Sequence, residues 1–280
     1  AIISMADNGG STGKLRAQYG VSAMGDIRKC LVALSQSPFK TVFTFRYTGG
    51  PYAGHSGGNL ILSQLELELG SFERAISHAK QMLNVPEAFD VLPSTLEKVT
   101  LHAKLADGTH LIGETTIDTC NAPRAPIEKV WLQPDSVIYE RARDVIQSAD
   151  MIVIGPGDFY TSIIPNFLVE GVSDAVKQSR AKKMYIGALA TKLGETDGFS
   201  AQDFVSRISQ YSGRLDYVMF NSQMPTSRVV GEYTRRGSAL VVPRAPRHTG
   251  WICTPLLSDP NIYPLDTAPL VAKHIMKLLK

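Results

Sequence analysis

Residues 4–16, SMADNGGSTGKLR, bring an acid, an amide, glycines, hydroxyls and bases together directly after a short apolar run. The stretch is similar to a P-loop because Gly13 and Lys14 end a glycine-rich turn. That motif, however, needs glycine where Asn8 stands and serine or threonine where Leu15 stands. The residues therefore argue against an ATPase phosphate loop.

The same loop can still bind an anionic ligand through its backbone. Gly9 and Gly10 follow the apolar run closely, and glycine lets backbone N–H groups approach an anion without obstruction by a side chain. We expect Asp7 to contact a cation or a ligand hydroxyl, while a solvated surface turn is the alternative. The residues predicted to bind the ligand here are Asp7, Asn8, Gly9, Gly10, Ser11, Lys14 and Arg16.

A second polar segment, GHSGGN, stands immediately before an apolar helical segment. Glycines at a helix N-terminus leave free N–H groups that suit a phosphate, and a histidine or an asparagine beside them can orient it. The alternative is a core histidine with a backbone partner. The predicted ligand-binding residues of this segment are His55, Ser56, Gly57 and Asn59.

Polar residues also follow later apolar runs. In residues 152–166, IVIGPGDFYTSIIPN, the glycines and the proline cannot continue a strand, so the chain must turn sharply and present the polar side chains that follow. The predicted ligand-binding residues here are Gly155, Gly157, Tyr160, Thr161, Ser162 and Asn166. Further ones come from LATKLGETDGFS and MFNSQ, namely Thr191, Glu195 and Asn221.

Carboxylates occur among these turns, and oxygen ligands suit a divalent cation such as Mg²⁺. Asp7 and Asp197 are the candidate metal ligands, and Asp158 and Glu195 are further candidates for a metal or base role. Together the turns predict a pocket for a phosphorylated ligand, bound with or without Mg²⁺.

The elements that must position these turns alternate between apolar runs and helical periodicity. Continuous apolar runs at 151–155, 184–190 and 217–220 are typical of strands buried on both faces of a parallel sheet, and ALVV at 239–242 is predicted as a last strand. We predict that residues 1–280 form one α/β domain with a doubly wound, mainly parallel Rossmann-like sheet. In such a fold the ligand lies outside the carboxyl ends of the strands.

Residues 91–132 differ from this pattern. KVTLHAKLADGTHLIGETTI alternates around Asp107 and Gly108, a dipeptide that favours a tight hairpin turn. We therefore predict an antiparallel β-rich insert. Because it lacks glycine clusters suited to anions, we expect it to lie apart from the ligand cradle.

Composition limits the class of protein. The chain has 280 residues, 44% of them hydrophobic, and a net charge of +3 without long blocks of either sign, which gives little support for nucleic-acid binding. Cys30, Cys120 and Cys253 are far apart, so neither a disulfide framework nor a Cys-x-x-Cys metal site is expected. No stretch is apolar enough to insert in a membrane, and no signal peptide pattern is present. These features favour a reducing, cytoplasmic setting.

Six blocks occur in the order found in one family: MADNGGSTGKLR, GDIRKCLVALS, GHSGGNLIL, VLPSTLEKVTLHAKLADG, IGPGDFYTSIIPN and GETDGFS. The chain resembles the gluconeogenesis factor (YvcK-like) proteins, which share a superfamily with 2-phospho-L-lactate transferase (CofD-like). The resemblance implies a cytoplasmic regulatory protein that binds a nucleotide sugar such as UDP-N-acetylglucosamine. It also implies links to gluconeogenic growth, cell shape and peptidoglycan synthesis.

The chain departs from this family at two points. Family members begin with a strand and a G-G-G-T-G-type loop, which we expect upstream of Ala1, since Ala1, Ile2 and Ile3 read as part of a strand. The usual acidic pair of the first block is Asp7 and Asn8 here, which leaves one carboxylate. A metal-dependent transfer that needs both acids would be weakened by this change.

Two alternatives to nucleotide-sugar binding stay open. The first is a magnesium-dependent transferase of a nucleotide-activated phospholactate-type group, and the second is a non-catalytic scaffold that acts through protein partners or as a homo-oligomer. A Ser-His-Asp hydrolase is not favoured because the chain has no G-x-S-x-G motif.

Overall fold

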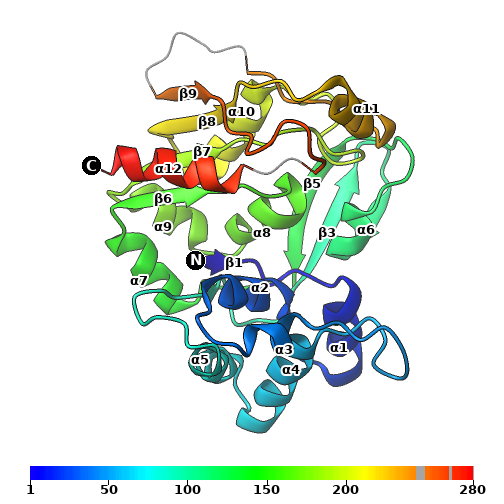
Figure 1. The fold of residues 1–280 in the computed structure, drawn as a ribbon, viewed down its shortest axis with the longest axis vertical. Coiled ribbons are helices and arrows are strands. Elements are labelled where there is room, and N and C mark those ends of the chain that lie inside the picture. The colour runs from blue at the N-terminus through cyan, green and yellow to red at the C-terminus, as the bar shows by residue number, and fades with distance from the viewer. Residues whose placement is uncertain (244–249, 265–266, 280) are drawn as a thin grey trace.

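The computed structural model describes residues 1–243, 250–264 and 267–279 and shows a mixed α/β fold (Figure 1). Two parallel sheets and one antiparallel sheet make up the strands of this part of the chain. The α/β class and the mainly parallel pairing are therefore as predicted. The parallel strands are divided, however, between a two-stranded and a four-stranded sheet.

The N-terminal part consists mostly of helices around a short parallel pair. β1 (Ile2–Ile3) pairs with β2 (Leu92–Pro93). The helices between them are α1 (Gly10–Tyr19), α2 (Gly25–Leu34), α3 (Lys40–Thr44), α4 (Gly57–Leu69) and α5 (Phe72–Met82). Ser71 caps α5 by accepting a hydrogen bond from the Arg74 N–H, as its position before an amphipathic segment predicts.

The β-rich insert forms a three-stranded antiparallel sheet in the order β4-β3-β5. Its elements are β3 (Thr100–Leu105), β4 (His110–Ile112), α6 (Glu114–Asp118) and β5 (Ile127–Gln133). The predicted hairpin at Asp107 and Gly108 joins β3 to β4, and Gly108 adopts a φ of +89°. The predicted span 91–132 also contains β2, which belongs to the parallel pair with β1 instead.

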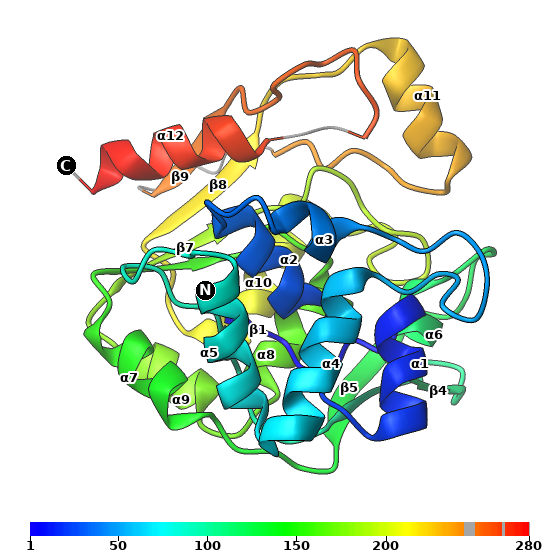
Figure 2. The same cartoon turned by 60° about the horizontal axis from the view of Figure 1, so that its bottom comes forward.

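The C-terminal part carries the larger parallel sheet, ordered β6-β7-β8-β9. Its strands are β6 (Met151–Ile154), β7 (Lys182–Ile186), β8 (Tyr217–Asn221) and β9 (Trp251–Thr254). The helices around it are α7 (Glu140–Ser148), the π-helical turn η1 (Phe159–Ile163), α8 (Ile164–Phe167), α9 (Val172–Gln178), α10 (Ala201–Ser212), α11 (Ser227–Arg235) and α12 (Ala268–Leu278). The views in Figures 1 and 2 place α12 on the opposite side of this sheet from α7 and α9.

The predicted strand at 239–242 is wrong. Leu240 makes only an isolated antiparallel bridge to Ala190, and β9 is the last strand that the structure describes. Pro243 follows directly and has no N–H to donate to a sheet, which explains why an apolar run alone does not extend the pairing.

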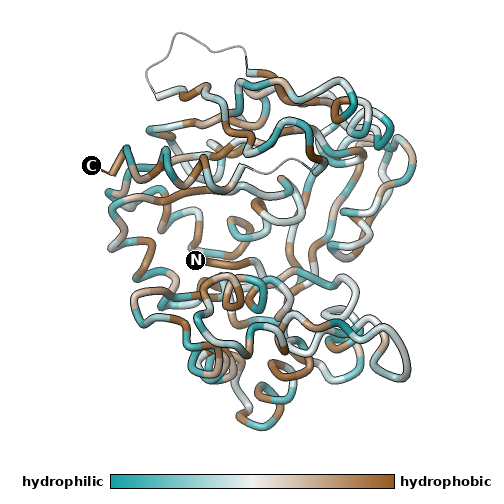
Figure 3. Tube along the Cα trace, in the orientation of Figure 1, coloured by the Kyte–Doolittle hydropathy of each residue, from teal (hydrophilic) through white to brown (hydrophobic). Residues whose placement is uncertain are grey.

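Buried apolar side chains form one main core and a smaller cluster. The main core joins the helices of the N-terminal part, the inner face of the insert and one face of the larger sheet. Figure 3 shows that hydrophobic residues recur along the helices and strands between hydrophilic ones. The smaller cluster lies beneath α12 and consists of Met184, Ile186, Met219, Leu256 and Val271. In the described part of the chain no helix is long and apolar enough to cross a membrane.

Candidate functional site

The loop between β1 and α1 is fixed by its acidic side chain. Asp7 is half-buried, and its Oδ1 accepts a hydrogen bond from the Gly9 N–H at 2.8 Å. A Cβ atom at Gly25, the first residue of α2, would lie 2.4 Å from Asp7 Oδ2, so only glycine lets this carboxylate reach the helix end. Burial raises the pKa of Asp7, while hydrogen bonds from Gly9 and Thr12 act to lower it.

Two side chains of the loop and α1 bind distant backbone groups. Arg16 donates to the carbonyl oxygens of Asp7 at 2.7 Å and of Val99 at 2.6 Å. Asn8 Oδ1 accepts a hydrogen bond from the Thr115 N–H at 2.9 Å. These contacts tie the glycine-rich loop to the insert, and a ligand-binding role for Arg16 and Asn8 stays a prediction.

His55 contacts the first turn of α1. Its Nδ1 lies 3.0 Å from Ser11 Oγ, and both residues are buried, so the partner of this histidine is a side chain and not the backbone. Burial, together with the positive charges of Lys14 and Arg46, lowers the pKa of His55, and the ring is therefore neutral at pH 7. A neutral imidazole accepts at one nitrogen and donates at the other, so its second nitrogen can serve a ligand.

The polar residues that open α4 are enclosed by protein. Ser56 Oγ accepts a hydrogen bond from the Asn59 N–H at 3.2 Å, and Asn59 Oδ1 accepts one from Arg28 Nε at 2.9 Å. A Cβ atom at Gly57 would lie 2.4 Å from the carbonyl oxygen of Val42. Close packing is thus sufficient reason for glycine at this position, and its contact with a phosphate stays a prediction.

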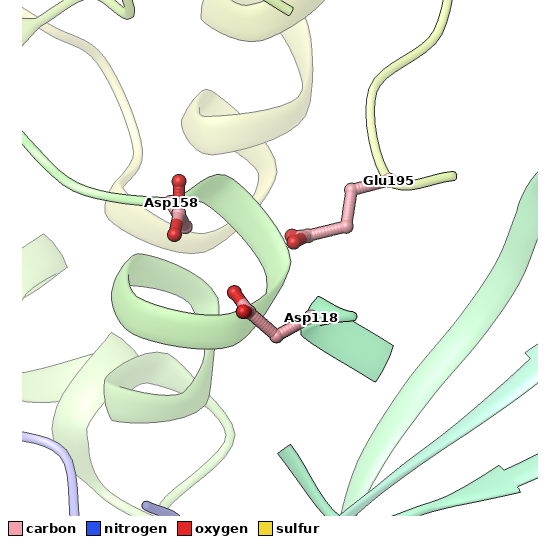
Figure 4. Close-up of side chains that lie close together, drawn as sticks. All are labelled: Asp118, Asp158 and Glu195. Atoms are coloured by element: carbon pink, nitrogen blue, oxygen red, sulfur yellow. The ribbon is translucent and has the colours of Figure 1, made fainter. Parts of the chain in front are cut away.

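Three carboxylates from separate segments lie close together (Figure 4), and all three pair with one lysine. Asp118 ends α6, Asp158 follows β6, and Glu195 lies in the loop after β7; one oxygen of each lies within 4.8 Å of the others. Lys192 Nζ lies 2.7 Å from Asp158 Oδ2 and 3.1 Å from Glu195 Oε1, and it also pairs with Asp118. We call Asp118, Asp158 and Glu195 the acidic cluster.

Charges in the acidic cluster perturb one another strongly. Burial raises the pKa of Glu195 to about 7, although Lys192 acts to lower it. Burial acts to lower the pKa of Lys192, but the surrounding carboxylates raise it overall, so this lysine stays charged. Burial, followed by repulsion from Asp7 and Asp118, raises the pKa of Glu114 to about 7. Glu114 therefore links the loop around Asp7 electrostatically to the acidic cluster.

The acidic cluster has the donor chemistry of a Mg²⁺ site. Carboxylate oxygens are the ligands that Mg²⁺ prefers, and three of them lie close enough here to face one ion. The ammonium of Lys192 pairs with all three, so an ion would have to displace it. The predicted metal ligands Asp7 and Asp197 do not belong to this group; Asp197 Oδ2 instead accepts a hydrogen bond from the Gly194 N–H at 2.6 Å.

The predicted site residues of the turn after β6 lie in two places, some at the acidic cluster and some in the core. Thr161 Oγ1 lies 3.4 Å from Glu195 Oε2 and so contacts the acidic cluster. Tyr160 is buried, and its hydroxyl accepts a hydrogen bond from Arg207 Nη1 at 3.0 Å. Asn166 Nδ2 donates to the Ser162 carbonyl at 2.9 Å, which turns this amide toward its own helix.

The remaining predicted residues organise the loops around the sheet edge. Gly155 has a φ of +83°, a conformation that favours glycine, and a Cβ atom at Gly157 would lie 3.3 Å from Ser162 Cβ. Thr191 Oγ1 accepts a hydrogen bond from the Ala239 N–H at 2.9 Å. The Asn221 side chain bonds to backbone groups of Gln223 and Leu256.

The insert contributes functional candidates that the sequence reasoning missed. Glu114, Thr115 and Asp118 all lie on α6, and they contact either the loop around Asp7 or Lys192. The expectation that the insert lies apart from the cradle is therefore wrong. The sequence signal for these candidates was the pair of acids in ETTID. The alternation of the neighbouring strands does not indicate which loop α6 contacts.

The fold and the polar turns define the class of this protein: an α/β protein with a parallel sheet. In open α/β sheets, ligands generally bind at the carboxyl ends of the strands. Residues 1–249 match the family described as 2-phospho-L-lactate transferase CofD. The chain is 37% identical over 250 residues to the gluconeogenesis factor of Halalkalibacterium halodurans, covering 86% of this chain and 76% of the relative. It is 38% identical over 229 residues to that of Bacillus subtilis, covering 80% of this chain and 71% of the relative.

A solved structure agrees with these sequence matches. The crystal structure of a UPF0052 family member from Bacillus halodurans is similar with a TM-score of 0.90 and 34% identity, and the match covers 99% of this chain and 90% of that one. The chain belongs to the CofD family and, within it, to the gluconeogenesis factors.

Proposed function

We propose that this chain is a cytoplasmic regulatory protein that binds a nucleotide sugar of the UDP-N-acetylglucosamine type. Its proposed roles are those implied by the gluconeogenesis factor family: carbon metabolism, cell shape and peptidoglycan synthesis. The site that we propose is the edge that contains the loop around Asp7, His55 and the acidic cluster.

The contacts that connect separate turns provide the main support. Ser11 Oγ lies 3.0 Å from His55 Nδ1, and Asn8 Oδ1 lies 2.9 Å from the Thr115 N–H. The Lys192 ammonium then joins the end of α6 to the turns after β6 and β7. Side chains that are far apart in the sequence are thus connected by direct contacts into one continuous region, and this is where we place the ligand.

The charges of this region suit the two chemical parts of such a ligand. Lys14 and Arg46 lie near His55 and can attract the diphosphate. Carboxylates are strong hydrogen-bond acceptors for sugar hydroxyls, and Glu114 and the acidic cluster provide them at the other end. The neutral ring of His55 can donate a hydrogen bond to a phosphate oxygen without adding charge.

The acidic cluster favours a second candidate function, the transfer of a nucleotide-activated phospholactate-type group. Asp118, Asp158 and Glu195 would hold Mg²⁺, which would neutralise charge on the transferred phosphoester. Lys192 would then be free to bind a phosphate oxygen.

Calorimetric titration distinguishes these functions. UDP-N-acetylglucosamine and a guanine nucleotide-activated phospholactate are titrated separately into wild type, with and without Mg²⁺. The mixtures are then analysed by chromatography for turnover, in which the phospholactyl group passes to water and the free nucleotide is released. We expect saturable binding of UDP-N-acetylglucosamine without turnover. Turnover of the nucleotide would favour the transferase, and the absence of binding by either nucleotide would leave the non-catalytic scaffold.

A further inference from the structure

We propose that the hairpin of residues 45–56 stacks the nucleobase of the ligand against its exposed aromatic rings, while Lys14 and Arg46 bind the phosphates. This inference rests on the proposed function, because it assigns the base and the phosphates of the same ligand to one part of the site.

The hairpin is a defined structure and is anchored to α1. The Tyr47 N–H donates to the His55 carbonyl at 3.0 Å, and the Gly54 N–H donates to the Tyr47 carbonyl at 2.8 Å. The Gly57 N–H closes the base of the hairpin by donating to the Phe45 carbonyl at 2.8 Å. Because His55 also contacts Ser11, the hairpin holds a fixed position beside α1, where Figures 1 and 2 show the α3–α4 connection.

The hairpin presents a row of aromatic rings to solvent. Phe45 is 57% exposed and Tyr52 is 56% exposed. The centroids of Phe45 and Tyr47 are 5.1 Å apart, and those of Tyr47 and Tyr52 are 5.7 Å apart. Phe45 and Tyr47 meet edge to face at 85°, and Tyr47 and Tyr52 are tilted by 50°. A planar base would therefore stack on the face of a single exposed ring, whatever the hydrogen-bonding pattern of the base.

Two cations flank the same surface. Arg46 Nη1 donates to the Gly54 carbonyl at 2.6 Å, and a Cβ atom at Gly54 would lie 3.8 Å from Lys14 Nζ. In the described ranges neither Lys14 nor Arg46 forms an ion pair with a carboxylate. Unpaired cations next to aromatic rings match the charge and shape of a nucleoside diphosphate.

Without Mg²⁺, the acidic cluster is unsuited to the phosphates of the nucleotide sugar. The carboxylates of the cluster would repel phosphates. Lys192 already pairs with all three carboxylates, so its charge is compensated. The phosphates therefore belong at the Lys14 and Arg46 end, with the base next to them on the hairpin. The sugar is left to extend toward Glu114 and the acidic cluster.

The test compares ligands with and without a base. Tyr52→Ala, Lys14→Ala and wild type are titrated calorimetrically with UDP-N-acetylglucosamine, with UDP and with N-acetylglucosamine 1-phosphate. Phe39→Ala is the matched control, because Phe39 is 55% exposed and lies at the start of α3, outside the hairpin. Thermal melts verify that each variant is folded.

We expect Tyr52→Ala to weaken both uridine ligands about tenfold and to leave the base-free sugar phosphate unchanged. Lys14→Ala should weaken all three ligands, and Phe39→Ala should weaken none. Equal binding of UDP by Tyr52→Ala and wild type would overturn the stacking role while the proposed function stands. If wild type binds no uridine ligand, both fail. A change of oligomeric state in Tyr52→Ala with unchanged affinity would show that the rings contact another copy of the chain.

Discussion

The two ends of the candidate site are built on different principles. The glycine-rich end, made of the loop around Asp7 and the residues 45–56 hairpin, depends on backbone conformation and close approach. The acidic cluster depends on charge, because Asp118, Asp158 and Glu195 would repel one another without Lys192. Substitutions of glycine at the first end should therefore act through sterics at every pH, whereas substitutions at the second end should depend on protonation.

The ends also differ in how far their charges are compensated. Lys14 is exposed at the glycine-rich end, whereas Lys192 is only 29% exposed and pairs with three carboxylates. A free cation is ready to bind a ligand anion, but a paired one must first exchange partners. The glycine-rich end can thus bind an anionic ligand directly. The carboxylates of the acidic cluster can bind a cation or a ligand only after it displaces Lys192.

The largest expected effect lies at the glycine-rich end. A Cβ atom at Gly13 would lie 2.0 Å from the carbonyl oxygen of Asn8, and the backbone there cannot move aside easily. Gly13→Val should lower the free energy of unfolding by about 3 kcal/mol, and the loss should be the same at pH 5 and pH 8. Urea denaturation measures both values.

Gly231→Ala is the control for this substitution. Gly231 lies in α11 and has open space where its Cβ would stand, so alanine should stabilise the protein by about 1 kcal/mol through helix propensity. A strongly pH-dependent loss in Gly13→Val would show that charge, and not sterics, governs this end as well.

The second effect tests charge compensation in the acidic cluster. Lys192→Met should lower the free energy of unfolding by about 2 kcal/mol at pH 8, because Glu195 has no exposed side-chain surface and would lose its counter-charge. Added Mg²⁺ should restore part of this loss. Lys182→Met is the matched control, since Lys182 is 62% exposed and its pair with Asp216 should contribute at most about 0.5 kcal/mol. Equal effects of the two substitutions would contradict the distinction between the two ends.

The third prediction is a pH dependence. Glu195 has a pKa of about 7 in the folded protein, above its ordinary value of 4.5, so the folded state binds more protons than the unfolded state between these limits. Its contribution to stability is therefore complete below pH 4.5 and is lost as the pH rises through 7, by about 3 kcal/mol. Glu195→Gln should flatten this part of the urea stability profile. An unchanged profile would mean that Glu195 stays ionised.

The smallest effect is expected away from both ends. Gly108 has a φ of +89° in the β3–β4 turn and nothing near its Cβ position, so Gly108→Ala should cost only about 1 kcal/mol of backbone strain. Affinity for UDP-N-acetylglucosamine should not change, because β4 separates the turn from the α6 side chains that contact the loop around Asp7 and Lys192. Calorimetry and urea denaturation check the two statements, and a loss of affinity with unchanged stability would place the turn in the site.

Local sequence signals determined most elements of this protein. Ser200 and Asp203 stand three positions apart directly before an amphipathic segment, which is the spacing of a capping box, and they form one at the start of α10. The dipeptide Asp107-Gly108 forms the hairpin turn, and the apolar runs near Met151 and Tyr217 form parallel strands. These outcomes depend on residues close together in the chain, where backbone preference and hydrophobic period decide the structure.

Only the tertiary structure decided which polar turns meet. Asp118 stands 40 or more positions from Asp158 and Glu195, and no spacing rule joins an acid of a β-rich insert to turns of a parallel sheet. Long-range packing also limits the run at 239–242, which meets a partner only at Ala190 and is followed by Pro243, a residue without an N–H to donate. Sequence patterns record local conformation, whereas the site depends on long-range packing that brings separate segments, and their charges, into contact.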